Sequence, residues 1–226
     1  MTDAVAMTGA VAMTDGGAMT DAESAPIVDG VLLAAGSSSR FGEQNKLLAR
    51  VDGEPVVRHA ARTLLDADLR SVVVVLGHDR DRVRETLSDL PVHTVHNPAY
   101  DEGQSTSVRT GIEAVRNGVA VTGPLRPDAV VIALGDMPFV DPESVDALCE
   151  AYAAGIGDVL APAHDGRRGN PVLFDRRYFD RLVGVEGDVG GREIIRSAAG
   201  AALVPVEDPG VRRDVDEPSD LPADGA

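Results

Sequence analysis

Three polar segments contain the residues of this 226-residue chain that could do chemistry. The first is the 36–46 loop, in which small residues are combined with two cations, Arg40 and Lys46. Small residues let backbone amides come close to an anion, and successive amides form an anion-binding concavity. The other two segments contain aspartates: Asp136 in one, Asp214 and Asp216 in the other. Because Mg²⁺ takes one or two carboxylates together with phosphate oxygens, these residue types favour a magnesium–phosphate site.

The 36–46 loop differs from two familiar phosphate-binding patterns. A P-loop has a second glycine five residues after the first, followed by Lys and Ser or Thr, whereas here Leu47 follows Lys46. The dinucleotide fingerprint requires Gly-x-Gly, whereas Gly36 is followed by serines. A flexible turn with an incidental charge is the alternative. Against it, Lys46 is the only lysine in a chain whose other 20 basic residues are arginines.

The composition narrows the class of protein. A net charge of −16 argues against a general nucleic-acid binder, which would carry a basic surface. A single cysteine, Cys149, rules out an intrachain disulfide and a multi-cysteine metal site. No apolar run approaches the ~18 residues of a membrane helix, and no secretory signal pattern is visible. We therefore expect a cytoplasmic protein without nucleic-acid or membrane partners.

Residues 1–26 differ in composition from the rest of the chain. An Ala-Met-Thr unit recurs every six residues, and the segment has four acids, no bases and no aromatic residues. Such a segment buries little apolar surface, so we expect a disordered acidic tail. The remainder, residues 27–226, is expected to form a single domain.

The ordered part alternates between two kinds of pattern. Apolar runs, most of them ending at glycine, predict buried parallel strands at 31–35, 71–76, 129–134 and 159–161, with a short strand at 92–96. Helical stretches lie at roughly 55–66, 80–88, 105–117 and 142–154; Asp141 is the expected N-cap of the last. The alternation predicts a doubly wound, mostly parallel α/β sheet. Residues after 163 are less regular, with a strand at 171–174 and a helix at 189–198, and are expected to cap one end of the sheet or add strands there.

Ligands of such sheets bind beyond the carboxyl ends of the strands, where the 36–46 loop begins. The run Leu33-Ala34-Ala35-Gly36-Ser37, followed by Arg40 and Lys46, resembles the signature of the nucleotidyltransferase superfamily with a GT-A-like fold. More closely it resembles the molybdenum cofactor cytidylyltransferases. The resemblance implies that residues 33–37 bind the nucleotide and that Arg40 and Lys46 hold its phosphates. The pair Ala35-Gly36 leans toward CTP, because related guanylyltransferases carry Gly-Gly there.

The two aspartate segments also resemble that family. Gly135-Asp136-Met137-Pro138 matches its pattern without change, which implies that Asp136 binds Mg²⁺. An aspartate that merely caps its loop is the alternative. The segment 213–221 resembles the family's second metal-site motif, with Asp216 favoured over Asp214 as the ligand; a solvated acidic tail is the alternative.

Two further segments complete the resemblance. Asn97, Gly103 and Ser107 match the family's nucleotide-proximal residues, although a helix capped by Ser105 would also explain this stretch. The acceptor substrate is expected to contact five residues: Gly169, Asn170, Pro171, Asp188 and Arg192.

The resemblance implies an enzyme that transfers CMP from CTP to the phosphate of molybdenum cofactor, releasing pyrophosphate. Mg²⁺ is its expected cofactor, and a molybdenum hydroxylase or its maturation chaperone is the expected protein partner. Two alternatives remain. One is a guanylyltransferase, or a nucleotidyltransferase that acts on a sugar or alcohol phosphate, of the same superfamily. The other is a non-catalytic carrier of the cofactor.

The charge balance generates a prediction about salt. An excess of acids with a single lysine suits the very salty cytoplasm typical of haloarchaea, because the Debye length falls to about 3 Å at 1 M salt and repulsion between surface carboxylates is screened. We expect thermal stability to rise steeply up to molar KCl, as measured by the melting temperature. Indifference to KCl would instead favour a GC-rich genome, which also enriches arginine, as the cause of the composition.

Overall fold

The computed structural model describes residues 25–37, 41, 45–119, 126–184 and 192–222, without the side chains of residues 192 and 193. Nearly all of the predicted tail, residues 1–26, therefore lies outside the described residues. Within the described residues, no helix is long and apolar enough to cross a membrane.

A seven-strand path runs through the main sheet, in the order β10-β7-β9-β6-β1-β4-β5. The strands are β1 (Val28–Ala34), β4 (Val72–Leu76), β5 (His93–His96), β6 (Ala129–Leu134), β7 (Val159–His164), β9 (Val172–Asp175) and β10 (Ala201–Pro205). All run parallel to β1 except β9, which is antiparallel to both of its neighbours. A short strand, β8 (Arg167–Arg168), pairs with β7. The predicted mostly parallel α/β sheet is confirmed.

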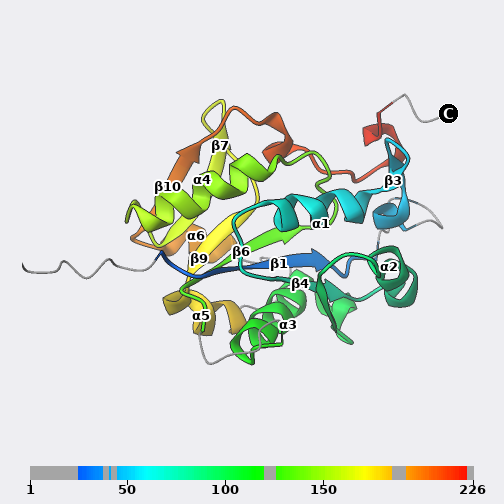
Figure 1. The fold of residues 1–226 in the computed structure, drawn as a ribbon, viewed down its shortest axis with the longest axis horizontal. Helices are drawn as coiled ribbons and strands as arrows, with labels where there is room; N and C mark the ends of the chain where they lie inside the picture. Colours follow the sequence, from blue (N-terminus) through cyan, green and yellow to red (C-terminus); the bar gives the residue numbers. More distant parts are fainter. Residues whose placement is uncertain (1–24, 38–40, 42–44, 120–125, 185–191, 223–226) are drawn as a thin grey trace, which may run out of the picture.

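Helices cover both faces of the sheet (Figure 1). Helices α1 (Val56–Asp66) and α4 (Pro142–Ala153) pack on one face, with α2 (Arg80–Thr86) beside them. Helices α3 (Gln104–Arg116), α5 (Phe179–Val183) and α6 (Arg192–Ser197) pack on the other. The predicted helices are confirmed, and most of their ends lie within two residues of the expected positions.

The central strands are buried on both faces, as their continuous apolar sequences predict. All seven residues of β1 and all five of β4 are buried. Helix α3 lies very close to these strands at Gly111, where a Cβ atom would stand 2.5 Å from Val31 Cγ1. The glycine thus lets helix and sheet meet in a densely packed core.

The chain after residue 163 builds part of the sheet and does not cap it. Strand β9 inserts between β6 and β7, with Val131 opposite Leu173 and Leu160 also opposite Leu173. Its four residues are all buried. A single short apolar run cannot show which two strands it will separate, so the sequence left this placement open.

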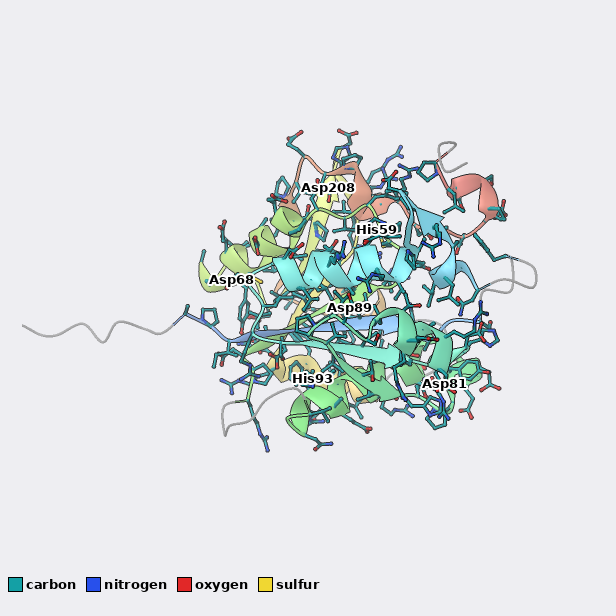
Figure 2. All side chains as sticks on the ribbon, turned by 45° about the vertical axis from the view of Figure 1, so that its right-hand side comes forward. His59, Asp68, Asp81, Asp89, His93 and Asp208 are labelled. Atoms are coloured by element: carbon teal, nitrogen blue, oxygen red, sulfur yellow. The ribbon has the colours of Figure 1, made fainter. Side chains whose placement is uncertain are left out.

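The start of α4 confirms the predicted N-cap residue, Asp141, followed by Pro142 at the first helical position. Asp141 occupies the N-cap position, but its side chain makes no capping hydrogen bond. The carboxylate of Asp208 tethers this end of the helix, because Oδ2 of Asp208 accepts from the Asp141 amide at 3.0 Å and from Ser144 Oγ at 2.9 Å. Asp208 lies beyond the sheet strands in sequence and is labelled in Figure 2. The C-terminal end of α4 is as predicted, because Gly155 comes directly after the C-cap residue with a φ of 71°.

The packing predicts a contrast between two isoleucines. Ile112, on α3, is completely buried, whereas Ile156, after α4, is 60% exposed. Replacing Ile112 with Ala should lower the free energy of unfolding by about 2–5 kcal/mol, through lost burial and a cavity. Ile156→Ala is the matched control, with an expected change within ~0.5 kcal/mol. Urea unfolding measures both, and equal effects would contradict the assignment of Ile112 to the core.

Candidate functional site

The carboxyl ends of β1, β4 and β6 meet at one edge of the sheet. The β1 arrow in Figure 1 points to this edge. Gly135, just after β6, donates its amide to Leu33 O at 2.9 Å. Gly77, just after β4, approaches so closely that a Cβ atom there would lie 2.6 Å from Ala35 O. These short approaches gather three strand ends around a pocket of about 360 Å³.

A short 3-10 helix, η1 (Lys46–Leu48), carries the single lysine into this pocket. Oδ1 of Asn45 accepts from the Leu47 amide at 3.0 Å and so caps the turn. The Leu47 side chain is only 3% exposed and anchors the turn in the apolar core. Lys46 Nζ then lies 2.6 Å from Asp136 Oδ2 and 2.6 Å from Asp216 Oδ1. The ammonium therefore bridges two of the predicted carboxylates.

The segment that carries Asp216 is bound to the loop that carries Asp136. The Val215 amide donates to Asp136 O at 2.8 Å. The Val215 side chain is fully buried in a small apolar cluster with Phe41, Val51 and Val56. This arrangement turns Asp216 toward the pocket, where it belongs to the lining.

Asp214 has a different environment. It is exposed and lies outside the lining of the described pocket. Its charge still acts at a distance, since it contributes to the raised pKa of Asp136. The geometry therefore favours Asp216 as the second carboxylate of the site.

The ion-pair cluster shifts the pKa values of its members. Burial raises the pKa of the Asp136 carboxyl, against the attraction of Lys46, and the negative charge of Asp214 adds to the rise. Burial acts to lower the pKa of the Lys46 ammonium, but the charges and hydrogen bonds of Asp136 and Asp216 outweigh it, and the pKa is raised. Because two carboxylates share one ammonium, negative charge remains in the cluster, and the cluster can bind a further cation.

One atom in the cluster indicates how a divalent cation would fit. Asp136 Oδ1 is buried and has no hydrogen-bond partner among the described residues. No group of three or more His, Cys, Asp or Glu side chains in the described part of the chain is placed to hold a metal. Two carboxylates suit Mg²⁺, which retains water or phosphate ligands, better than a cation that needs an all-protein cage. Asp136 and Asp216 are the residues that would hold it.

Most of the predicted nucleotide-binding residues reach the pocket. Those in its lining are Leu33, Ala35, Gly36, Ser37, Gly103 and Ser107, besides Lys46 and Asp136. Arg40, predicted to hold phosphate, lies outside the described residues. Ala34 corrects the prediction, because it is 1% exposed and packs in the apolar core on the α1 side of the sheet. Residues alternate sides along a strand, so Leu33 and Ala35 face away from Ala34.

Asn97 also corrects the prediction. It is 2% exposed, and its amide nitrogen donates to Thr106 Oγ1 at 2.8 Å and Ser107 Oγ at 3.0 Å. Its Oδ1 accepts from the Ala99 amide at 3.0 Å. Asn97 therefore holds the start of α3 against the turn after β5 and lies beneath the pocket lining. It positions Ser107, which does line the pocket.

The start of α3 excludes the alternative of a helix capped by Ser105. Helix α3 begins at Gln104, and Gly103 occupies the N-cap position with a φ of 116°. Ser105 lies inside the helix and is buried. The pocket lining here also includes three residues that the sequence patterns did not single out: Tyr100, Asp101 and Gln104. None of the three belongs to a recognisable sequence motif. Only the position of their turn next to β1 in the fold identifies them as lining residues.

A second, smaller pocket of about 100 Å³ adjoins the first. Both are lined by Leu33, Gln104 and Leu134. Asn170, one of the predicted acceptor-binding residues, lines the smaller pocket beside Arg168. The two pockets thus lie side by side between the carboxylate cluster and β9, and the pair is called the trough below.

The other predicted acceptor residues fall elsewhere. Gly169 packs closely against the backbone, because a Cβ atom there would lie 2.4 Å from Val211 O; its contact with the acceptor stays a prediction. Pro171 is buried and lies outside the lining of the smaller pocket. Asp188 and the Arg192 side chain lie outside the described part of the structure.

Histidine and cysteine residues lie outside the described pocket lining. His59 Nε2 is 2.8 Å from Val51 O on the α1 face. His93 lies on β5, well apart from His59 (Figure 2). Burial, together with nearby carboxylates, raises the pKa of the Cys149 thiol to about 12. The site therefore depends on carboxylates, an ammonium and backbone amides.

Comparison with known proteins places this architecture in context. Residues 30–203 match the model of a family described as the MobA-like NTP transferase domain. The purine catabolism protein PucB of Bacillus subtilis is 29% identical over 203 residues, covering 87% of this chain and 95% of PucB. The nicotine blue oxidoreductase of Paenarthrobacter nicotinovorans is 29% identical over 198 residues, covering 84% and 93% of the two chains.

Solved structures agree on the fold. Rv0371c from Mycobacterium tuberculosis superposes with a TM-score of 0.73 at 25% identity, covering 87% of this chain and 96% of Rv0371c. Rv0371c has also been solved as a complex with manganese.

The ion-pair cluster predicts how stability depends on pH. In EDTA-containing buffer, Lys46→Met leaves two carboxylates without their shared ammonium, which should cost about 2 kcal/mol at pH 7.5. The pKa of Asp136 in the folded variant rises above its unfolded value, so the protonated form is stabilised at low pH and this stabilisation is lost as pH rises. The loss of unfolding free energy relative to the wild type, measured by urea unfolding, should therefore be smaller at pH 5 than at pH 7.5. Adding Asp136→Asn should remove much of that pH dependence; an unchanged dependence would show that Asp136 is not the titrating group.

Proposed function

The chain belongs to the MobA-like NTP transferase domain family, and on this premise we propose that it transfers CMP from CTP to the phosphate of molybdenum cofactor. The observation that carries the proposal is the cluster at the sheet edge. There Lys46 Nζ lies 2.6 Å from a carboxylate oxygen of both Asp136 and Asp216. A triphosphate with a divalent cation needs this combination of mobile positive charge and fixed carboxylates.

The loop after β1 supplies the phosphate-binding surface. Gly36 and Ser37 are exposed and line the pocket beside Lys46. Backbone amides of small residues can approach phosphate oxygens closely. Lys46 would move its ammonium onto those oxygens, which release it from the carboxylates, and Asp136 and Asp216 would then hold Mg²⁺. When bound, Mg²⁺ neutralises charge on the phosphates; Rv0371c in complex with manganese is consistent with a divalent cation here.

The reaction requires little acid–base chemistry from the protein. An oxygen of the acceptor phosphate attacks the α-phosphorus of CTP, the bond to the β-phosphate bridging oxygen breaks, and pyrophosphate leaves in line. The acceptor phosphate is largely ionised at neutral pH, so no base has to remove a proton. The described pocket contains no histidine, in keeping with catalysis by positioning and charge neutralisation.

The trough offers the acceptor a route to the α-phosphorus. The smaller pocket adjoins the nucleotide pocket and combines apolar side chains with Arg168, Asn170 and Gln104. A planar, polar heterocycle such as a pterin suits this combination, because apolar walls stack on its faces and polar groups meet its edge. Ala35, in the nucleotide pocket and 4% exposed, carries the sequence preference for CTP over GTP. We propose a molybdenum hydroxylase or its maturation chaperone as the recipient of the product.

Nucleotide choice tests the proposal directly. The protein is incubated at high KCl with Mg²⁺, molybdopterin-type cofactor and each of the four NTPs in turn, and pyrophosphate is measured. We expect release with CTP, and release that depends on the cofactor. Release with GTP, or only with a sugar phosphate as acceptor, would identify a different transferase of this superfamily. CTP binding without any pyrophosphate would indicate a non-catalytic carrier.

Two substitutions connect that activity to the site. Lys46→Ala and Asp136→Ala should each lower turnover at least ~100-fold, because each removes a charge that acts on the reacting phosphates. The melting temperature shows whether the fold survives. Asp180→Ala is a suitable control, since Asp180 is 85% exposed on α5 and far from the pocket lining. Near-normal turnover of either site variant would refute the assignment.

A further inference from the structure

A second aspartate supports the segment that carries Asp216. Asp220 ends a short 3-10 helix, η6 (Pro218–Asp220). Its Oδ2 accepts from the Asp216 amide at 2.9 Å and from the Glu217 amide at 2.7 Å. The Asp220 amide in turn donates to Glu217 O at 3.0 Å. One carboxylate oxygen therefore fixes two consecutive peptide groups, including that of Asp216.

This support matters because Asp216 lies on irregular backbone. Its side chain is 39% exposed, and no helix or strand holds residues 213–217. The N-terminal side of the segment is attached to the β6 loop through Val215, whose amide donates to Asp136 O, and through Arg213, whose guanidinium lies 3.7 Å from the centre of the Phe139 ring. Asp220 supplies the attachment on the C-terminal side.

Part of this support is the ordinary capping of a helix start, because Asp220 accepts from the amide of Glu217, the N-cap residue of η6. Asp220 brings a further carboxylate close to the backbone of Asp216 in a protein of net charge −16. Repulsion between like charges opposes that placement, whereas a charge-assisted hydrogen bond from an amide favours it. A side-chain amide oxygen can also accept from these two peptide groups, so an accepting oxygen is the feature that the arrangement needs.

We propose that Asp220 is a positioning residue that holds the Asp216 carboxylate in the pocket beside Asp136, where the two carboxylates would hold a divalent cation. The inference rests on the proposed function insofar as Asp216 is a cation ligand. Asp220 itself does not touch the reacting atoms; it acts through the peptide groups of Asp216 and Glu217. Loss of such an outer partner typically lowers metal affinity about 10–100-fold.

The test compares two substitutions of one residue. Asp220→Ala removes the accepting oxygen, whereas Asp220→Asn removes the charge and keeps an oxygen that can accept. Mn²⁺ binding is measured by electron paramagnetic resonance, with and without CTP. Asp220→Ala should weaken Mn²⁺ binding at least ~10-fold, and Asp220→Asn should restore it to within about 2-fold of the wild type. Ser219→Ala, an exposed position on the same turn, is the matched control and should leave binding unchanged.

Amide hydrogen exchange provides a readout that is independent of metal and activity. The amides of Asp216 and Glu217 should exchange faster in Asp220→Ala and return toward the wild-type rate in Asp220→Asn. A wild-type Mn²⁺ affinity in Asp220→Ala, or an equal loss in the Ala and Asn variants, would overturn the proposal. The same holds if Asp216→Asn leaves Mn²⁺ binding intact, or if the wild type binds no Mn²⁺.

Failure of the proposed function looks different. Wild-type protein that binds Mn²⁺ but produces no pyrophosphate with any NTP would refute nucleotidyl transfer. In that case the contrast between Asp220→Ala and Asp220→Asn would still decide the role of Asp220.

Discussion

The arrangement of the site depends on one ammonium group. Lys46 Nζ meets carboxylates that lie 90 and 170 residues further along the chain, and so joins the β1 loop, the β6 loop and the C-terminal segment. In a chain of net charge −16, carboxylates brought together at a half-buried edge repel one another unless a cation stands between them. The only lysine of the sequence occupies that position. A compact ammonium can exchange one set of oxygens for another more readily than the planar guanidinium of arginine. A lysine therefore suits the proposed transfer of this charge from carboxylates to phosphates.

Much of the fold follows from the sequence, because the central strands are continuous apolar runs and glycines mark where they end. The run 129–134 coincides with β6, and its neighbour β1 ends level with it, with Leu33 opposite Leu134. That register places Asp136 beside the loop after β1, so the proximity of the two predicted motifs follows from the parallel sheet. Strand β9 shows the limit of this reasoning. Its sequence indicates a buried strand, but its partners, β6 and β7, are determined by tertiary packing that a short apolar run does not encode.

The site was harder to predict residue by residue, because a motif identifies residue types and not the direction of a side chain. Asn97 occupies a matching position, yet it is buried and bonds to Thr106 and Ser107. Gly169 likewise serves close packing against Val211. Conversely, Tyr100 and Gln104 line the pocket without belonging to any recognisable spacing. Asp220 is similar: in sequence it is one acid among several at the C-terminus, and only its two hydrogen bonds distinguish it from a solvated tail.

The two pockets draw on partly different parts of the fold. The nucleotide pocket is built from parallel strand ends and the Lys46 cluster, whereas the smaller pocket takes Arg168 from β8, Asn170 from the β8–β9 connection, and Val172 and Phe174 from β9. The two pockets share three lining residues: Leu33, Gln104 and Leu134. These are the main positions at which a substitution affects both pockets. Substitutions in the smaller pocket can therefore leave the geometry of Lys46, Asp136 and Asp216 unchanged. Proteins named for purine catabolism and for an oxidoreductase match this chain over more than four-fifths of its length, which agrees with the general rule that one fold can carry sites of different chemistry.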